Sequence, residues 1–405
     1  MRGRVLAPLF AIVALVWPAA TAAGPTEQTP LQRSLARALR VPHVATARSA
    51  ALALDLATGS VVFVQNGHRS LAPASNAKLP LTYAALAKLG ATYRIDTDVL
   101  GQGAQDGTTW NGALVLKGNG DPTLSRAGLR ALALQVRAAG IRRVTDGIIG
   151  DESAYDARRM VSGWKASFYI SESPPLSALI VDRGRVGRYT TRAPALAAAT
   201  AFRAALRNAG VAVVGAVRVG RAGEDWLEPL ASVSSPTLAT MLRFMDKESD
   251  NFTAEMLLKQ LGVAELDRGT SAAGASVVTQ ALVDAGVPMT GVRIVDGSGL
   301  STLDRLTVDA LGSLLNLAWA DPDIHPLLLA SLPVAGVSGT LEKRLLKATT
   351  RGRVIAKTGT TDIASALSGY VGDRFAFAVL QNGHPLAYWW ARRAQDRFVS
   401  VLAAQ

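Results

Sequence analysis

The sequence contains no cysteine in its 405 residues. The protein therefore needs no disulfide bond, and its hydrophobic cores must hold the fold together alone. Histidine is also scarce, and the four present are His43, His68, His325 and His384. None of them lies in the sequence context of a catalytic triad, and their spacing matches no metal site. We interpret each as a surface or packing residue, and we expect the protein to use neither a metal nor another cofactor.

Charged residues are few as well, at 18% of the chain against 49% hydrophobic residues. This balance argues against general disorder, and the length predicts two or three domains. The formal net charge of +12 suits anionic surroundings, so peripheral contact with a cell wall or a membrane remains open. Nucleic acid is not expected as a partner, because the arginines are scattered and no basic run is interleaved with aromatic residues. The sequence does not indicate an oligomeric state.

The apolar stretch near the N-terminus, residues 5–17, is shorter than the ~20 residues that a membrane-spanning helix needs. Two arginines precede it and small residues follow at 20–22, which is typical of a secretory signal. We predict that residues 1–22 are a signal peptide and that the protein works in the periplasm or another extracytoplasmic cell-wall space. An uncleaved N-terminal anchor is the alternative, since the uncharged stretch continues to Ala23.

Runs typical of β-strands occur near both ends of the chain, and helical patterns lie between them. The N-terminal pair, "SAALALDL" and "VVFVQN", flanks a turn at Gly59 and predicts a hairpin. The C-terminal strand candidates are "RVIAKTGT", "SALSGYV" and "RFAFAVLQN". We therefore predict an α+β fold in which both chain ends build one antiparallel sheet that helices cover.

The pattern of predicted secondary structure changes between residues 97 and 231. Loop-rich segments such as "GQGAQDGTTWNG" alternate there with short strand-like runs and with two helical patterns that end at glycine. We predict that residues 97–231 form one or two inserted α+β domains. Residues 23–96 and 232–405 would then form the main domain.

The helical stretch "PASNAKLPLTYAALAKLG" places Ser75 one turn before Lys78. A serine hydroxyl is a weak nucleophile until a base takes its proton, and one helical turn puts both side chains on the same face. To act as that base, Lys78 must be neutral, so its pKa must fall well below about 10.4. Taken alone, a serine at this position is a helix cap more often than a nucleophile. A second S-x-x-K, Ser162 to Lys165, is followed by no long helix, and we interpret it as a loop.

Two further motifs support the nucleophile. Ser249-Asp250-Asn251 and Lys357-Thr358-Gly359-Thr360 follow Ser75 and Lys78 in the chain. S-x-x-K, S-x-N and K-T-G in this order are the signature of penicillin-binding proteins and serine β-lactamases.

Each residue of the third motif has a chemical property that suits a substrate-binding site. Gly359 has no side chain, so a substrate backbone can approach the strand and add to its edge. The N–H groups of Ser75 and Thr360 are our prediction for the oxyanion hole, where losing one donor costs ~3 kcal/mol. Lys357 supplies a cation for a terminal carboxylate and for lowering the pKa of Lys78. We expect Lys78, beside the nucleophile, to lose its proton first.

The chain resembles the D-alanyl-D-alanine carboxypeptidases and endopeptidases of the penicillin-binding protein 4 type, peptidase family S13. The resemblance covers nearly the whole mature chain, including a long insertion between the first two motifs. Stretches outside the motifs also carry it, among them "GNGDPTL", "PLSALIVDRGRV", "VDGSGLS" and "VAGVSGTLEKR". It implies a transpeptidase-like domain shared with serine β-lactamases, peptidoglycan stem peptides as substrate, and β-lactams as inhibitors.

The resemblance also implies roles for single residues. Ser75 would be the acylated nucleophile, Lys78 the general base and Ser249 a proton relay to the leaving group. Asn251 would hold the substrate amide, while Lys357 and Thr358 would bind the terminal carboxylate. The glycine-rich "DGSGLS" receives no catalytic role, and we expect Ser298 to serve a turn.

Two alternative functions and one departure remain. A β-lactamase shares the acylation chemistry but must deacylate quickly, and no E-x-x-x-N-type loop is evident. A catalytically inactive cell-wall-binding module would be expected to lack a motif residue, whereas all are present.

The sequence departs from the expected helix at Pro80. This proline removes a backbone N–H within the predicted helix and predicts a kink just beyond Lys78.

Overall fold

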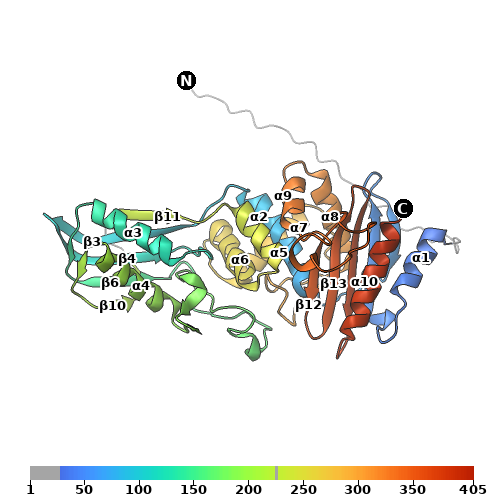
Figure 1. Cartoon of the computed structure of the whole chain (residues 1–405), viewed down its shortest axis with the longest axis horizontal. Helices are drawn as coiled ribbons and strands as arrows, with labels where there is room; N and C mark the ends of the chain where they lie inside the picture. Colours follow the sequence, from blue (N-terminus) through green and yellow to red (C-terminus); the bar gives the residue numbers. More distant parts are fainter. Residues whose placement is uncertain (1–27, 224–226) are drawn as a thin grey trace, which may run out of the picture.

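The computed structural model describes residues 28–223 and 227–405, so the predicted signal peptide, residues 1–22, lies outside the described residues. The molecule is elongated, with one sheet and its helices toward each end (Figure 1). Across the two described ranges, no helix combines the length and the apolar character needed to cross a membrane.

The first sheet is built from both ends of the chain, as the sequence predicts. Its five antiparallel strands have the order β12-β13-β14-β1-β2. The strands are β1 (Ser49–Asp55), β2 (Val61–Gln65), β12 (Val354–Thr360), β13 (Ala364–Val371) and β14 (Phe375–Asn382). The central pairing joins β1 to β14, with Ser49 opposite Gln381, so neither chain end can form this sheet alone.

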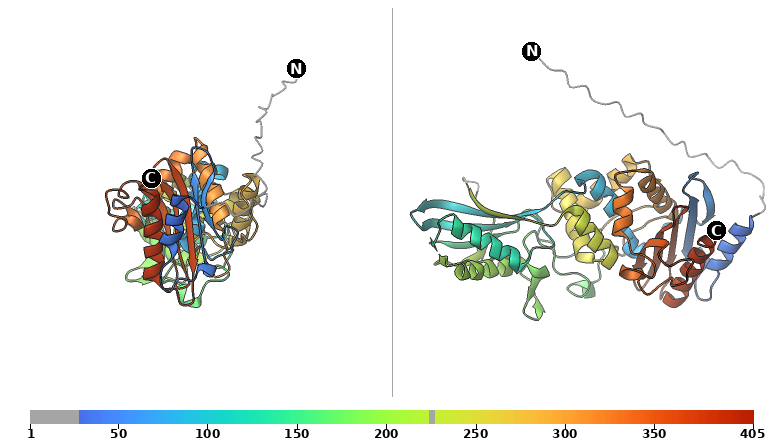
Figure 2. Two further views of the ribbon diagram at one scale, coloured as in Figure 1. Left: turned by 90° about the vertical axis from the view of Figure 1, so that its right-hand side faces the viewer. Right: turned by 45° about the horizontal axis from the view of Figure 1, so that its top comes forward.

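Helices cover both faces of this sheet. On one face, α1 (Pro30–Leu39) and α10 (Tyr388–Leu402) lie side by side (Figure 2). They pack over a core that includes Leu35, Phe377 and Phe398. The other face carries the larger core and the remaining helices of this body. These are α2 (Lys78–Leu89), α5 (Leu238–Glu248), α6 (Asn251–Leu266), α7 (Ser271–Asp284), α8 (Val308–Ala320) and α9 (His325–Ser331).

Strand β1 shows how the sequence pattern divides these two cores. Leu52 and Leu54 point into the larger core, whereas Ala51 and Ala53 face α1 and α10. Alternate residues of a strand point to opposite faces, so a strand covered on both sides is apolar throughout.

A second sheet lies within residues 96–234, close to the predicted insertion. Its main path is β10-β6-β4-β3-β11, with β5 and β9 at the side. The strands are β3 (Asp96–Asp106), β4 (Thr109–Gly118), β5 (Arg143–Val144), β6 (Gly147–Asp151), β9 (Ala212–Val213), β10 (Val217–Val219) and β11 (Glu228–Ser234). Helices α3 (Arg126–Ala138) and α4 (Pro194–Asn208) pack on it around a separate core that contains Trp110 and Phe202. The short strands β7 (Arg185–Val186) and β8 (Tyr189–Thr190) form a small hairpin.

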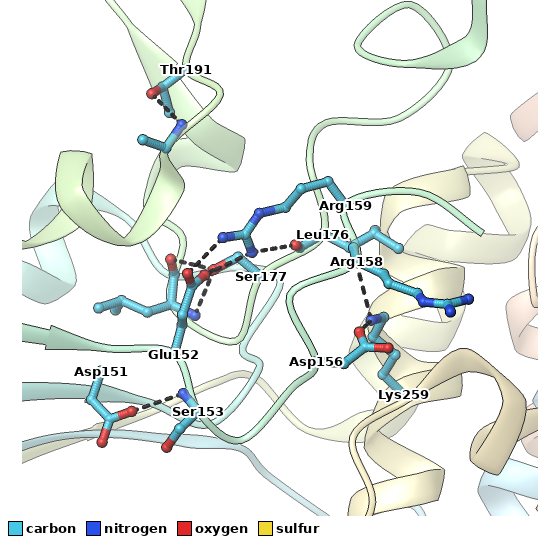
Figure 3. A network of polar contacts seen from close by, with 12 residues as sticks. Asp151, Glu152, Ser153, Asp156, Arg158, Arg159, Leu176, Ser177, Thr191 and Lys259 are labelled. Carbon is cyan, nitrogen blue, oxygen red and sulfur yellow. Dashed lines mark hydrogen bonds and ion pairs between the residues drawn. The ribbon is translucent and has the colours of Figure 1, made fainter. Parts of the chain in front are cut away.

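The segment 152–181 connects the two bodies through polar contacts (Figure 3). Within it, Arg159 donates to both carboxylate oxygens of Glu152, at 2.6 and 2.7 Å. Asp156 forms an ion pair with Lys259 of α6, whose side chain is buried. The Tyr155 hydroxyl donates to the Met256 carbonyl at 2.9 Å. Part of the predicted insertion therefore packs directly on the main body, and the domain boundaries stay a prediction.

The start of α2 differs from the continuous helix that the sequence predicts. Ser75 lies in a 3-10 turn, Ala74–Ala77, and the α-helix begins at Lys78. The predicted kink beyond Lys78 is wrong, because α2 runs unbroken to Leu89. Pro80 is the third residue of this helix, in the first turn, where a backbone N–H has no partner within the helix anyway.

Candidate active site

The structure brings the three motifs together where α2 begins, where α5 meets α6, and beside β12. Lys78 is fully buried, and its Nζ atom lies 3.2 Å from the Oγ atom of the half-buried Ser75. The S-x-x-K spacing therefore does place lysine and serine in contact, although the backbone between them is a 3-10 turn.

The Lys78 ammonium donates to two further oxygens from distant parts of the chain. These are Oδ1 of Asn251 at 2.9 Å and the carbonyl of Ser298 at 2.8 Å. Burial lowers the pKa of Lys78 to about 8, although nearby carboxylates, Asp296 foremost, act in the opposite direction. A substantial share of this amine is thus neutral just above neutral pH.

The S-x-N motif lies at the break between α5 and α6. Ser249 ends α5 with a left-handed φ of 57°, and Asp250 begins α6 by accepting a hydrogen bond from the Thr253 N–H at 2.7 Å. Asp250 also pairs with Arg183, at 2.6 Å. The reversal lets Ser249 and Asn251, only two residues apart, face two different lysines.

Lys357 is the second of these lysines. It is fully buried, and its Nζ atom donates to Ser249 Oγ at 2.9 Å and to the Thr358 carbonyl at 3.2 Å. Burial, and then repulsion from the Lys78 ammonium, lower the pKa of Lys357 to about 7. Two buried amines this close titrate as a pair, so the expectation that Lys78 loses its proton first stays a prediction.

Strand β12 passes close to Ser75. A methyl group on Gly359 would lie 3.1 Å from the Ser75 backbone nitrogen and 2.9 Å from the Pro73 carbonyl oxygen, so only glycine fits without displacement. The side chain of Asn76 donates to the Lys357 carbonyl at 3.1 Å and holds the strand against the turn. Because β12 is the last strand of the sheet, its outer edge at 358–360 pairs with no strand among the described residues.

The remaining residues of the third motif lie at the surface end of this edge. Thr358 is half-buried, and its hydroxyl lies 2.7 Å from that of Thr340. Thr360 is exposed and directly follows Gly359, the residue of β12 that approaches Ser75.

The turn 296–301 is the part of the site that sequence reasoning missed. Ser298 serves a turn, as expected, but its carbonyl also accepts from Lys78. Two buried carboxylates hold this turn: Asp296 accepts from the N–H groups of Gly299 and Ser301, and Glu255 from that of Ser298. The signal was present in "VDGSGLS", but a main-chain acceptor leaves no mark on the residue type.

The second S-x-x-K has no such geometry. The Ser162 carbonyl accepts a hydrogen bond from Ser301 Oγ at 2.8 Å, and Lys165 pairs with Asp362 at the surface. Both lie in irregular structure, as the sequence predicts.

Two serines, each in contact with a buried lysine beside an edge strand, define a serine-type acyl-transfer site on a penicillin-binding fold. More narrowly, the chain belongs to the D-Ala-D-Ala carboxypeptidase 3 (S13) family, whose model matches residues 31–193 and 186–405. The family resemblance seen in the sequence is thereby confirmed.

Individual relatives agree with this assignment. A D-alanyl-D-alanine carboxypeptidase of Actinomadura sp. (strain R39) is 32% identical over 450 residues, which cover 91% of this chain and 84% of that protein. Carboxypeptidase DacB of Mycolicibacterium smegmatis is 35% identical over 401 residues, covering 89% and 83%. The fold is similar to the crystal structure of penicillin-binding protein 4 (dacB) from Haemophilus influenzae, with a TM-score of 0.81 at 21% identity, covering 92% of this chain and 98% of that one.

Proposed function

We propose that this protein is a serine-type D-Ala-D-Ala carboxypeptidase or endopeptidase that acts on peptidoglycan stem peptides through an acyl-enzyme on Ser75. The contact between Ser75 and Lys78 carries the proposal, because the lysine is buried and its pKa is lowered to about 8. The relatives from Actinomadura and Mycolicibacterium smegmatis are a D-alanyl-D-alanine carboxypeptidase and Carboxypeptidase DacB, which supports the substrate class.

In the acylation step, neutral Lys78 accepts the proton of the Ser75 hydroxyl while Ser75 Oγ bonds to the substrate carbonyl carbon. The backbone N–H groups of Ser75 and Thr360 stabilise the oxyanion that forms. The closeness of β12 to Ser75 at Gly359 supports this pairing of donors.

Collapse of the tetrahedral intermediate breaks the C–N bond to the terminal D-Ala, and Ser249 Oγ passes a proton to the departing amine. The contact of Ser249 with Lys357 supports this relay, since the ammonium makes the hydroxyl a better proton donor. Water then hydrolyses the ester and releases the shortened peptide. When the departing amine belongs to a neighbouring stem, the same steps cut a cross-link.

Substrate binding uses the edge of β12 as a template for an added strand. Lys357 and the Thr358 hydroxyl bind the terminal carboxylate, and the Asn251 side chain holds the substrate amide. Asn251 is suited to this because its Oδ1 accepts from Lys78 while its Nδ2 donates at 3.2 Å to the Glu172 carbonyl, which fixes its orientation.

β-Lactams are proposed inhibitors, because their carbonyl and carboxylate match the same groups. One of the similar structures is that of the Haemophilus influenzae protein complexed with a novel β-lactam, at a TM-score of 0.76. Acylated Ser75 is expected to be long-lived, in contrast to the rapid turnover of a β-lactamase.

We further propose that the chain is exported and that residues 1–22 are removed, so that it meets peptidoglycan in the periplasm or an equivalent space. N-terminal sequencing of the protein from the producing cell tests this. A first residue of Ala23 is expected, and an intact Met1 would support the anchor.

The decisive experiment combines labelling with product analysis. Peptide mapping of a fluorescent penicillin adduct should find the label on Ser75, Ser75→Ala should abolish labelling, and Ser162→Ala is the matched control that should label normally. Mass spectrometry of defined muropeptides, monomeric and cross-linked, then separates carboxypeptidase from endopeptidase activity. A label on Ser162, or no loss of D-Ala and no cleaved cross-link, would contradict the proposal.

A further inference from the structure

An arginine from residues 97–231, the predicted insertion, reaches the turn between α5 and α6. Arg183 donates one hydrogen bond to each carboxylate oxygen of Asp250, the middle residue of the S-x-N motif, at 3.1 and 2.6 Å. Its guanidinium also lies over the ring of the buried Phe252, 4.9 Å from the ring centroid. A forked ion pair of this kind fixes the orientation of its partner as well as its position.

The backbone is strained on both sides of this contact. Asp182 and Arg183 have left-handed φ angles of 47° and 56°, and Ser249 has one of 57°. Such angles are costly for residues with a side chain and persist only where the surroundings enforce them. Because the ion pair joins the two strained turns, each turn helps to hold the other.

The arginine is held in turn by the body that contains the second sheet. Asp182 pairs with Arg126, the first residue of α3, at 3.2 Å. The Asp182 backbone N–H donates to the Leu124 carbonyl at 2.8 Å. Residues 182–184 therefore connect the start of α3 to the S-x-N turn.

Asp250 lies between the two motif residues that contact the lysines. Ser249 precedes it and Asn251 follows it, and each lies 2.9 Å from the Nζ atom of one lysine. Only 15% of the Asp250 side chain is exposed. Burial would raise its pKa, but the hydrogen bonds and charge of Arg183 help to lower it below the ordinary value, so the carboxylate stays ionised. Without Arg183 this mostly buried charge would lose its cation, and we expect the turn to open toward water.

We propose that Arg183 is a positioning residue of the acyl-transfer site, which through Asp250 holds the turn that presents Ser249 and Asn251 to the two lysines. The inference rests on the proposed function of the site. It gives residues 97–231 a part in the reaction, because the side chain that fixes the S-x-N turn comes from that range. Arg183 acts through Asp250 and not on the reacting atoms.

The test substitutes Arg183→Ala in the full chain and measures the rate of acylation by fluorescent penicillin. Loss of the ion pair should let the S-x-N turn move, and a displacement of this kind lowers the rate by about 10²-fold. Arg185→Ala is the matched control, because this exposed arginine lies two residues further along the chain, and it should acylate at the wild-type rate. Arg183→Lys keeps the charge without the fork and should recover part of the rate.

A second background shows whether Arg183 works through Asp250. Asp250→Asn removes the buried charge but keeps an acceptor for the Thr253 N–H at the start of α6. Removing Arg183 from that variant should cost far less than removing it from wild type, because no charge is left unpaired. An equal loss in both backgrounds, or an Arg183→Ala enzyme that acylates at the wild-type rate, would overturn the inference. If Arg183→Ala does not fold, Arg183→Lys carries the same comparison.

Penicillin acylation keeps this test separate from the peptidase proposal. The label reports the geometry around Ser75 whatever the natural substrate is. If wild type releases no D-Ala and cuts no cross-link in any muropeptide, the proposed substrate is wrong, while the acylation rates still decide the role of Arg183.

Discussion

The Nζ atom of Lys78 lies 2.9 Å from the Oδ1 atom of Asn251, although the two residues are 173 positions apart in the chain. This contact joins the start of α2 to the start of α6 and closes the site on one side. With the Ser298 carbonyl and Ser75 Oγ, it also gives the buried ammonium three acceptors, so the charged form is well solvated by the protein. Lys78 can act as a base only because burial offsets that stabilisation.

Removing this lysine should separate binding from chemistry. Lys78→Ala should lower the rate of penicillin acylation by about 10³-fold, the scale of a lost general base. Stopped-flow measurement with fluorescent penicillin gives this rate, and Lys165→Ala, in the second S-x-x-K, is the control that should stay near wild type. A Lys78→Ala enzyme that acylates at the normal rate would show that another group takes the proton.

Lys357→Ala tests the coupling between the two lysines. Repulsion from the Lys78 ammonium lowers the pKa of Lys357, and the same repulsion acts on Lys78. Loss of this neighbouring cation should raise the pKa of Lys78, so the acidic limb of kcat/KM should move to higher pH. KM for carboxylate-ended peptides should also rise, and for amide-ended peptides hardly at all. Weaker binding with an unmoved acidic limb would leave Lys357 as a carboxylate anchor only.

Gly359→Ala should damage acylation without unfolding the protein. The added methyl group would press against the Pro73 carbonyl and the Ser75 nitrogen. It would move β12, which carries the proposed Thr360 donor, away from the proposed donor at Ser75. A displacement of this kind costs about 10²-fold in rate. Gly220→Ala, where the methyl group would meet the end of the Arg218 side chain, is the control. Equal acylation rates in both variants would exclude β12 from the oxyanion hole.

The ion pair between Asp156 and Lys259 predicts that removing the carboxylate destabilises the protein more than removing the ammonium. Lys259 is 1% exposed, so Asp156→Asn leaves an uncompensated buried ammonium and should lower the free energy of unfolding by about 3 kcal/mol. Lys259→Met removes that charge at similar volume and should cost less. Urea unfolding of both variants measures the difference. If the methionine variant is the less stable one, the pair is strongly favourable in its own right.

Residues 97–231 are predicted to be an insertion, and the structure suggests what their removal costs. Replacing them with a short linker should leave a soluble main body, because its two largest cores come from residues outside this range. The deletion would uncover Phe252 and Met256 of α6, which pack against Tyr155 and Trp164, so a loss of stability is expected. Penicillin acylation should slow, however, since the Trp164 indole N–H that donates to Asp296 at 2.8 Å is lost with them. Trp164→Phe in the full chain should reproduce part of that slowing. A shortened protein that is always unfolded would show that the boundary is wrong.

Much of this protein is decided by local sequence. Alternating or continuous apolar runs determined β1, β2 and the three C-terminal strands, and the helical periodicity determined α1, α3 and α4, because these patterns reflect which faces are buried. The three motifs identified Ser75, Lys78, Ser249, Asn251 and Lys357 as one candidate site, because their residue types and spacing match a known chemistry.

Only the tertiary structure decided how that site is charged. The pKa of a lysine depends on burial and on carboxylates from other elements, so how far the pKa values of Lys78 and Lys357 are lowered does not follow from spacing. The carbonyl of Ser298 became visible as a partner of Lys78 only once the turn 296–301 was placed against α2. Every residue has a main-chain carbonyl, and the strength of an electrostatic interaction depends on distances that the fold sets. Neither therefore leaves a pattern in the sequence.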